Sequence, residues 1–127
     1  MKSEVKTILS VELAKEAARV ADNEKGEDIL ILNVEGISNI TDTFVIISGK
    51  TRNHARAIGQ QIEDHLKTNY AVECFSAVGY RDTDWVALDF RNLVVHIFSP
   101  ETRAYYNLER LWGDAPIVEW RVGAAQN

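Results

Sequence analysis

Apolar residues recur every three to four positions near the start of the chain, which predicts a helix. The helix is predicted from about Val11 to Asn23, and its apolar stripe consists of the alanines at positions 14, 17, 18 and 21. Ser10 comes directly before the stripe and is expected to cap this helix, so residues 1–9 are expected to form a flexible N-terminus. An alanine stripe buries little area, so this helix should pack closely against its neighbours and gain little free energy from doing so.

Two further segments show helical spacing. Thr51 is the predicted cap of a helix that ends at about Asn69 and whose inward positions are aliphatic. Ser99 is the predicted cap of a last helix, because proline follows it and Gly113 provides a stop. Asn107 is expected to divide that last helix into two pieces.

Strand patterns fill the space between these helices. Residues 28–34 and 43–48 are nearly continuous apolar runs, which indicates strands covered on both faces. Residues 71–78 predict another strand, and residues 82–98 predict a hairpin. The order of the elements predicts an α/β fold with a single mixed β-sheet of about five strands and flanking helices.

The predicted hairpin has two unlike faces. If Arg91 and Asn92 form its turn, alternation gives one purely apolar face that should be core: Val86, Leu88, Phe90, Leu93, Val95 and Ile97. The other face carries Trp85, Ala87, Asp89, Val94, His96 and Phe98. Large aromatic rings beside a carboxylate and an imidazole fit an active site, a partner-binding face or a face covered by another helix.

The length of 127 residues fits one domain with a real core. We place that domain at residues 10–116 and treat residues 117–127 as a C-terminal tail, in which Ile117 begins either an edge strand or a mobile segment. The single cysteine, Cys74, cannot form an internal disulfide and is expected to be a small buried side chain. With no signal or transit peptide pattern, a cytoplasmic protein is expected.

Charge and hydropathy narrow the possible partners. The formal net charge is −5, and no segment gathers lysine and arginine into the basic stripe that neutralises phosphates. Direct binding of nucleic acid is therefore not expected, whereas an acidic surface favours a basic partner. The longest aliphatic run, 29–32, is far shorter than the roughly 20 residues of a membrane helix, so no membrane association is expected.

The stretch Ser48-Gly49-Lys50-Thr51 follows a predicted strand and precedes a predicted helix, as a phosphate-binding loop would. That motif needs a glycine five positions before Gly49, and Phe44 stands there. A tight strand-to-helix turn is therefore the favoured interpretation.

The sequence also contains few candidate metal-binding or catalytic residues. The only Asp-x-Asp pair, Asp82 and Asp84, lies in a predicted turn, so a Mg²⁺ site is disfavoured. The three histidines, His54, His65 and His96, do not stand at metal-ligand spacing. His96 could act as a general base oriented by Asp89, but no nucleophile is suggested nearby, and a hydrogen-bonded structural histidine is favoured. We expect neither a metal nor a cofactor.

Aromatic residues gather in the second half of the chain: Tyr80, Trp85, Tyr105, Tyr106 and Trp112. Tryptophan and tyrosine with flanking charges are typical of protein interfaces. For Trp85 an interface role is favoured, because aspartates surround it. For Trp112 the alternative is that it packs the last helix onto the hairpin.

The sequence resembles the ribosomal silencing factor family, also called Iojap-like, over residues 10–116. The resemblance is carried by the strings DTFVIISG, VGYRDTDWVALDF, VVHIF and YYNLERLWGDAP, in that order. It implies a nucleotidyltransferase-like fold without the catalytic carboxylates, and hence no enzyme. It further implies binding to the large ribosomal subunit through its fourteenth protein, which blocks joining of the small subunit and represses translation when nutrients are scarce. The alternatives are a Mg²⁺-dependent nucleotidyltransferase and a large-subunit assembly adaptor without repression.

From the residues and the resemblance together we expect a docking surface for a basic ribosomal protein. It should consist of the mixed face of residues 82–98 and the adjoining last helix, with Trp85 as the apolar anchor. Asp89 and Glu109 would accept hydrogen bonds from the partner's cations. The predicted protein-binding residues are Tyr80, Trp85, Asp89, His96, Arg103, Tyr106, Glu109 and Trp112. The same apolar face is a possible homodimer surface in the free protein.

Overall fold

The computed structural model describes residues 2–81 and 83–121, with the side chains of residues 10–81 and 83–121. The elements, in chain order, are α1 (Lys2–Asn23), β1 (Glu27–Asn33), β2 (Thr43–Ser48), α2 (Arg52–Tyr70), β3 (Ser76–Val78), β4 (Trp85–Asp89), β5 (Leu93–Phe98), α3 (Pro100–Tyr106) and α4 (Leu108–Leu111). The strands form a single five-stranded sheet in the order β1-β2-β5-β4-β3. Because β2 and β5 are parallel and the other neighbours antiparallel, the sheet is mixed, which confirms the predicted fold class.

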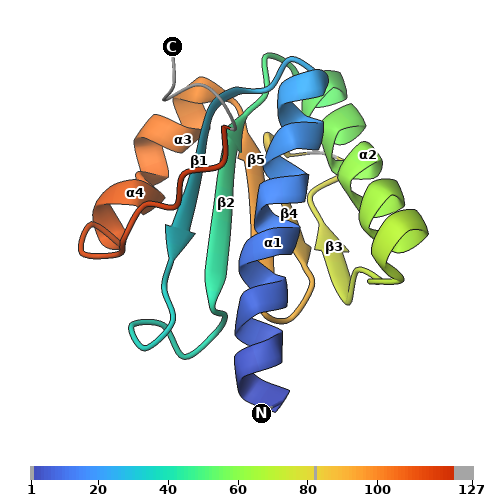
Figure 1. Ribbon diagram of the computed structural model, residues 1–127. Coiled ribbons are helices and arrows are strands. Elements are labelled where there is room, and N and C mark those ends of the chain that lie inside the picture. The colour runs from blue at the N-terminus through green and yellow to red at the C-terminus, as the bar shows by residue number, and fades with distance from the viewer. Residues whose placement is uncertain (1, 82, 122–127) are drawn as a thin grey trace.

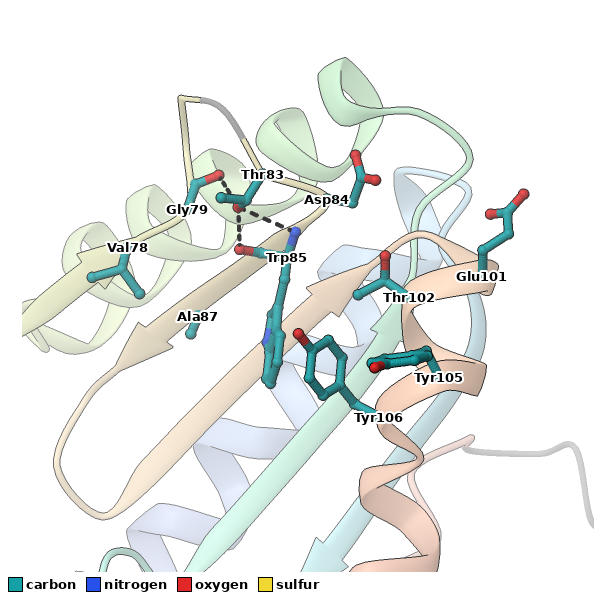
Figure 2. A pocket seen from close by; sticks show the side chains of 10 residues that line it. All are labelled: Val78, Gly79, Thr83, Asp84, Trp85, Ala87, Glu101, Thr102, Tyr105 and Tyr106. Carbon is teal, nitrogen blue, oxygen red and sulfur yellow. Dashed lines mark hydrogen bonds between the residues drawn. The ribbon is translucent and has the colours of Figure 1, made fainter.

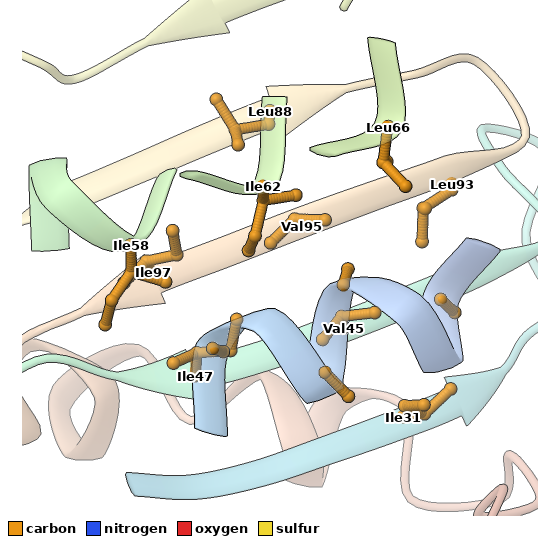
Figure 3. Close-up of a cluster of buried hydrophobic side chains, with 14 of the residues drawn as sticks. Ile31, Val45, Ile47, Ile58, Ile62, Leu66, Leu88, Leu93, Val95 and Ile97 are labelled. Atoms are coloured by element: carbon orange, nitrogen blue, oxygen red, sulfur yellow. The ribbon is translucent and has the colours of Figure 1, made fainter. Parts of the chain in front are cut away.

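Helices α1 and α2 lie side by side over one face of the sheet (Figure 1). Between them and the strands lies the main core. Figure 3 labels ten of its aliphatic members: Ile31, Val45, Ile47, Ile58, Ile62, Leu66, Leu88, Leu93, Val95 and Ile97. The alanine stripe of α1 is fully buried. Small side chains let the helix backbone approach the sheet closely, as the sequence predicted.

The other face of the sheet is only partly covered. Helices α3 and α4 follow β5 and lie over this face (Figure 1), where Leu108 and Trp112 pack against Phe44 and Val94. Among the described residues, no helix covers this face at β4 and the short edge strand β3 (Figure 1), and all three residues of β3 are exposed. An open half-face with apolar side chains therefore remains beside α3.

The predicted start of the first helix is wrong. Helix α1 begins at Lys2, so residues 2–9 are helical and Ser10 lies inside the helix instead of capping it. Ser10 is 1% exposed, its hydroxyl donates to the carbonyl of Asn92 (2.8 Å), and it lies 2.7 Å from the hydroxyl of Thr43. These contacts join α1 to β2 and to the β4–β5 turn, and no local sequence pattern predicts them.

The other caps are confirmed. The Thr51 hydroxyl accepts a hydrogen bond from the amide of His54, and the Ser99 hydroxyl accepts one from the amide of Thr102. Asn107 has a left-handed backbone (φ 49°) and separates α3 from α4, as expected.

The strand predicted over residues 71–78 is shorter than expected. Ala71 ends α2 in a left-handed conformation, and only Ser76–Val78 pair with β4. The hairpin turn at Arg91 and Asn92 is confirmed, because the Phe90 amide donates to the Leu93 carbonyl (2.8 Å). Its register sends the two sets of side chains to the two faces that alternation predicted.

The start of the predicted tail runs beside β1. Ile117 forms a single bridge with Leu32, and the amide of Val118 donates to the carbonyl of Ile31 (2.9 Å). Of the two predicted alternatives, an edge strand or a mobile segment, the structure shows a short contact at the edge of the sheet. Residues 122–127 of that tail lie outside the described residues. Within the described part of the chain, none of the helices has the length and apolar character that crossing a membrane requires.

Candidate functional site

The open half-face of the sheet contains two adjoining hollows, which we call the Trp85 groove. The first lies between β4 and α3, has a volume of about 860 Å³ and is shown in Figure 2. Its lining residues are Val78, Gly79, Thr83, Asp84, Trp85, Ala87, Glu101, Thr102, Tyr105 and Tyr106. The second, of about 420 Å³, extends toward α4 and is lined by Ile40, Phe44, Ser76, Val78, Trp85, Ala87, Asp89, Val94, His96, Leu108 and Trp112. Val78, Trp85 and Ala87 line both hollows.

Aromatic rings build the walls of this groove. The Trp85 ring lies 5.0 Å from Phe98 and 4.8 Å from Tyr106, measured between centroids, and so connects β4 and β5 to α3 (Figure 2). Phe44 lies 5.6 Å from Trp112 and connects β2 to the segment after α4. These spacings are those of favourable aromatic pairs, so the walls are packed surfaces.

The residues of the groove differ in how much of each side chain is exposed. Tyr106 is 52% exposed and Tyr105 is 82% exposed, although Tyr105 was not among the predicted site residues. Trp85, Asp89 and Trp112 are partly buried and line the groove. Trp112 packs on Phe44, as the packing alternative predicted. It also borders the second hollow, where a partner could reach it.

His96 lies in the second hollow and is largely buried. Its Nδ1 atom accepts a hydrogen bond from the Trp85 indole Nε1 (3.0 Å). Burial lowers the pKa of His96 to about 4, so the imidazole is neutral at physiological pH. Asp89 does not orient it, because the Asp89 Oδ1 atom accepts from the amide of Arg91 (2.7 Å). The favoured interpretation, a hydrogen-bonded structural histidine, agrees with this geometry.

Tyr80 does not belong to the groove. It packs with the core cluster on the α2 side of the sheet, where its hydroxyl donates to Glu63 and its ring lies against Gly59. Desolvation, followed by the hydrogen bond to Glu63, raises the pKa of Tyr80 far above its ordinary value. The backbone reverses direction at Gly79 (φ 93°), which sends this aromatic to the opposite face from Trp85.

Arg103 and Glu109 form an internal ion pair. Arg103 is 8% exposed, its Nε atom donates to Glu109 (2.9 Å), and its Nη1 atom donates to the Ser48 hydroxyl (2.8 Å). The guanidinium therefore joins α3, α4 and the end of β2. Both residues were predicted to bind a partner, but these contacts engage two of the three guanidinium nitrogens and one carboxylate oxygen within the chain.

The turn from β2 to α2 is a structural turn, as the sequence predicted. The amide of Gly49 donates to the carbonyl of Phe98 (2.9 Å), and a side chain at Gly49 would lie 3.2 Å from Ala55. Glycine therefore fits the close approach of the helix to this turn, where a larger residue would require a small shift of Ala55. The Nη1 atom of Arg103 donates to the Ser48 hydroxyl (2.8 Å), so a guanidinium lies beside the start of this turn.

Other candidate chemical groups have internal partners too. Asp84 pairs with Arg52 (2.8 Å), and Asp82 lies outside the described residues. Among the described residues, no group of three histidine, cysteine or acidic side chains is placed to hold a metal ion. Burial raises the pKa of the Cys74 thiol, which is the opposite of what a nucleophilic cysteine needs.

The groove also contains residues that sequence reasoning missed. Glu101 and Thr102 face the first hollow from the first turn of α3, and Ile40 borders the second hollow from the β1–β2 loop. Ile40 is 75% exposed, and an isoleucine among turn-forming residues was a signal that could have been used. The position of Glu101 depends on the docking of α3 and has no sequence signal.

The sequence model of a family described as "ribosomal silencing factor during starvation" matches residues 7–127 of this chain. The chain belongs to this family. The ribosomal silencing factor RsfS of Bacillus subtilis is 39% identical over 114 residues, covering 90% of this chain and 96% of that protein. The RsfS of Halalkalibacterium halodurans is 40% identical over 108 residues, covering 85% of this chain and 92% of that protein. The resemblance found in the sequence motifs is thereby confirmed.

A relative with a different name also matches this chain. A mouse protein named mitochondrial assembly of ribosomal large subunit protein 1 is 34% identical over 93 residues, covering 70% of this chain and 40% of that protein.

Two solved structures share the fold of this silencing factor. A Chromobacterium violaceum protein has a TM-score of 0.78 at 27% identity, covering 92% of this chain and 96% of that one. A Bacillus halodurans protein has a TM-score of 0.68 at 36% identity, covering 86% and 95%. The family is named for silencing the ribosome and not for a reaction, which fits a regulator that acts by binding.

Proposed function

We propose that this ribosomal silencing factor docks through the Trp85 groove onto a basic protein of the large ribosomal subunit, the fourteenth, and thereby hinders joining of the small subunit. Membership of the silencing factor family supports the ribosome as the target. The observation that carries the choice of surface is the groove itself, a partly exposed aromatic hollow of about 860 Å³ on a sheet face that α3 and α4 cover only in part. Apolar hollows of this kind are typical of binding surfaces.

The charges around the groove support a basic partner. Asp84 and Glu101 line the first hollow, and Asp89 lines the second. Lysine and arginine side chains of a partner can reach these carboxylates while apolar atoms cover the rings. The formal net charge of −5 adds a long-range attraction toward a cationic surface.

Silencing in this proposal needs no catalysis. A bound protein of this size occupies the surface that the small subunit would contact, and a stable complex typically buries about 1,600 Å² in total. The energy of such an interface is concentrated in a few aromatic and arginine side chains near its centre. Trp85 holds that place, because it borders both hollows.

Replacing Trp85 by alanine tests the proposal directly. Loss of a central anchor costs about 2 kcal/mol or more, which corresponds to about thirtyfold weaker binding. The measurement is co-sedimentation of the purified protein with large ribosomal subunits at graded concentrations. Circular dichroism and a thermal unfolding curve of the variant show whether its fold is kept.

Tyr70→Ala is a matched control, because Tyr70 is an exposed aromatic residue at the end of α2, on the opposite face of the sheet. This control should co-sediment like the unchanged protein. Equal retention of a folded Trp85→Ala protein would remove the groove from the binding site.

A second candidate function is a role in assembly of the large subunit without repression. The name of the mouse relative, which refers to assembly of the ribosomal large subunit, favours it. Sucrose gradients of starved cells that lack the protein separate the two functions. Repression predicts more joined ribosomes in these cells, whereas an assembly role predicts immature large-subunit particles with unchanged joining.

A further inference from the structure

His96 stands next to the most central aromatic ring of the Trp85 groove. On β5 it lies between Ile46 of β2 and Ala87 of β4. Its Nδ1 atom accepts a hydrogen bond from the Trp85 indole Nε1, with 3.0 Å between the two nitrogens. An accepting Nδ1 carries no hydrogen, so the imidazole is neutral and its proton is on Nε2.

The strand register explains why these two side chains meet. Trp85 is directly opposite Phe98, and His96 is the diagonal neighbour two residues earlier on β5. The residue directly opposite His96 is Ala87, whose small side chain leaves room for the indole to lean along the strand. Phe98 and Tyr106 pack against the indole, so hydrogen bonding and stacking together fix the ring.

This contact determines what the Trp85 ring offers to a partner. The single polar group of the indole is engaged by His96, so its exposed atoms are hydrocarbon. The ring borders both hollows, so a rotation about its side-chain bonds would change the shape of each. A ring held in place before binding avoids the ordering cost that a mobile side chain adds to association.

We propose that His96 is a positioning residue, which holds the Trp85 indole in the orientation that keeps both hollows open to the ribosomal partner. This inference rests on the proposed docking function for its effect on binding, but the orientation of the indole can be measured without the ribosome. His96 acts through Trp85, and its own contact with a partner is not needed.

Few charges oppose this arrangement. Among the described residues that line the second hollow, Asp89 is the other ionisable side chain, and one of its oxygens accepts from the Arg91 amide. Burial lowers the pKa of His96 to about 4. A lowered pKa means that the histidine is neutral above about pH 4, so the hydrogen bond to the indole persists at physiological pH and is lost on acidification below that value.

Two substitutions separate the hydrogen bond from the bulk of the side chain. His96→Leu fills similar space and removes the acceptor. His96→Asn places its Oδ1 atom at the position of Nδ1, two bonds from Cβ, and retains an acceptor. The indole N–H signal of Trp85 in a nitrogen–proton spectrum, assigned with Trp85→Phe, reports on the contact. Slow hydrogen exchange of this proton is expected in the unchanged and His96→Asn proteins, and fast exchange in His96→Leu.

Binding to purified large subunits supplies the second measurement. His96→Leu should bind about tenfold more weakly, and His96→Asn should stay within about threefold of the unchanged protein. In a Trp85→Phe background, which has no indole N–H to hold, His96→Leu should have no further effect. His65→Leu, a histidine replacement on α2 over the opposite face of the sheet, should leave binding unchanged.

The outcomes are distinguishable. Slow indole exchange in His96→Leu would overturn the positioning role, and so would a His96→Leu defect of equal size in the Trp85→Phe background. Unchanged binding of His96→Leu with fast indole exchange would also overturn it, since the orientation would then not matter for docking. If Trp85→Ala binds normally, the proposed docking surface is wrong, and the exchange rates alone decide whether His96 holds the indole.

Discussion

Single residues of the same chemical type have opposite roles in this protein. Arg103 and Arg110 are both arginines of the last helical segment, but Arg103 is 8% exposed and Arg110 is exposed. Arg103 donates to the Glu109 Oε2 atom and to the Ser48 hydroxyl at once. Its contribution is therefore to the fold, and it positions α3 and α4 beside the groove.

Replacing Arg103 by leucine should destabilise the protein. The change leaves a partly buried carboxylate at Glu109 and the Ser48 hydroxyl without their donor, at a cost of about 2 kcal/mol or more in the free energy of unfolding. Urea denaturation followed by circular dichroism measures it. Arg110→Leu is the control and should stay within about 0.5 kcal/mol. Equal stability of the two variants would contradict a structural role for the buried ion pair.

Elements of the same apparent type also differ in how they begin. Ser10 and Thr51 each come directly before a segment with helical spacing, and both were predicted as helix caps. Thr51 is an exposed cap of α2, whereas Ser10 is buried inside α1 against Thr43 and Asn92. The difference arises from where each helix packs, because α1 continues along the sheet past its expected start.

Substituting aspartate at Thr51 and at Ser10 should distinguish a helix cap from a buried contact by the change in stability. Aspartate is as good a cap as serine or threonine, so Thr51→Asp should change the free energy of unfolding by no more than about 0.5 kcal/mol. Ser10→Asp places a carboxylate in a site that is 1% exposed and should cost about 3 kcal/mol or more. Urea denaturation of both variants measures the difference. A tolerated Ser10→Asp would show that α1 begins later than Lys2.

The whole molecule presents an acidic surface to its surroundings, and the Trp85 groove has carboxylates along its border. Long-range attraction toward a cationic ribosomal protein is screened by salt, because the Debye length falls to about 8 Å at physiological ionic strength. The groove thus combines an apolar contact that is insensitive to salt with a charge attraction that is not.

Asp89→Asn should weaken attachment to large subunits about two- to fivefold at low salt and less at high salt. The fold should be kept, because an asparagine oxygen can still accept from the Arg91 amide. Co-sedimentation at two ionic strengths provides the test. Asp64→Asn on α2 changes the net charge equally but lies away from the groove, so it should have a smaller effect. Equal losses from both variants would indicate a net-charge effect without a local contact.

Local patterns in the sequence determined the elements and the two faces of the hairpin. Alternation placed Trp85 and His96 on the same face, and the caps at Thr51 and Ser99 follow from hydroxyl groups that bond amides three residues ahead. The sequence motifs also indicated the silencing factor family. The elements, the hairpin faces and the caps depend on residues close together in the chain, which is why they can be predicted without the fold.

Only the tertiary structure decided which side chains reach the surface. Tyr80 was expected beside Trp85 and instead packs on α2, and Arg103 was expected at a partner and instead binds Ser48. Ser10 meets Asn92 across 82 residues of chain. Burial and long-range pairing depend on how helices and strands pack in space. Packing brings together residues that no local pattern relates, so it also fixed the Trp85 groove and the hydrogen bond between Trp85 and His96.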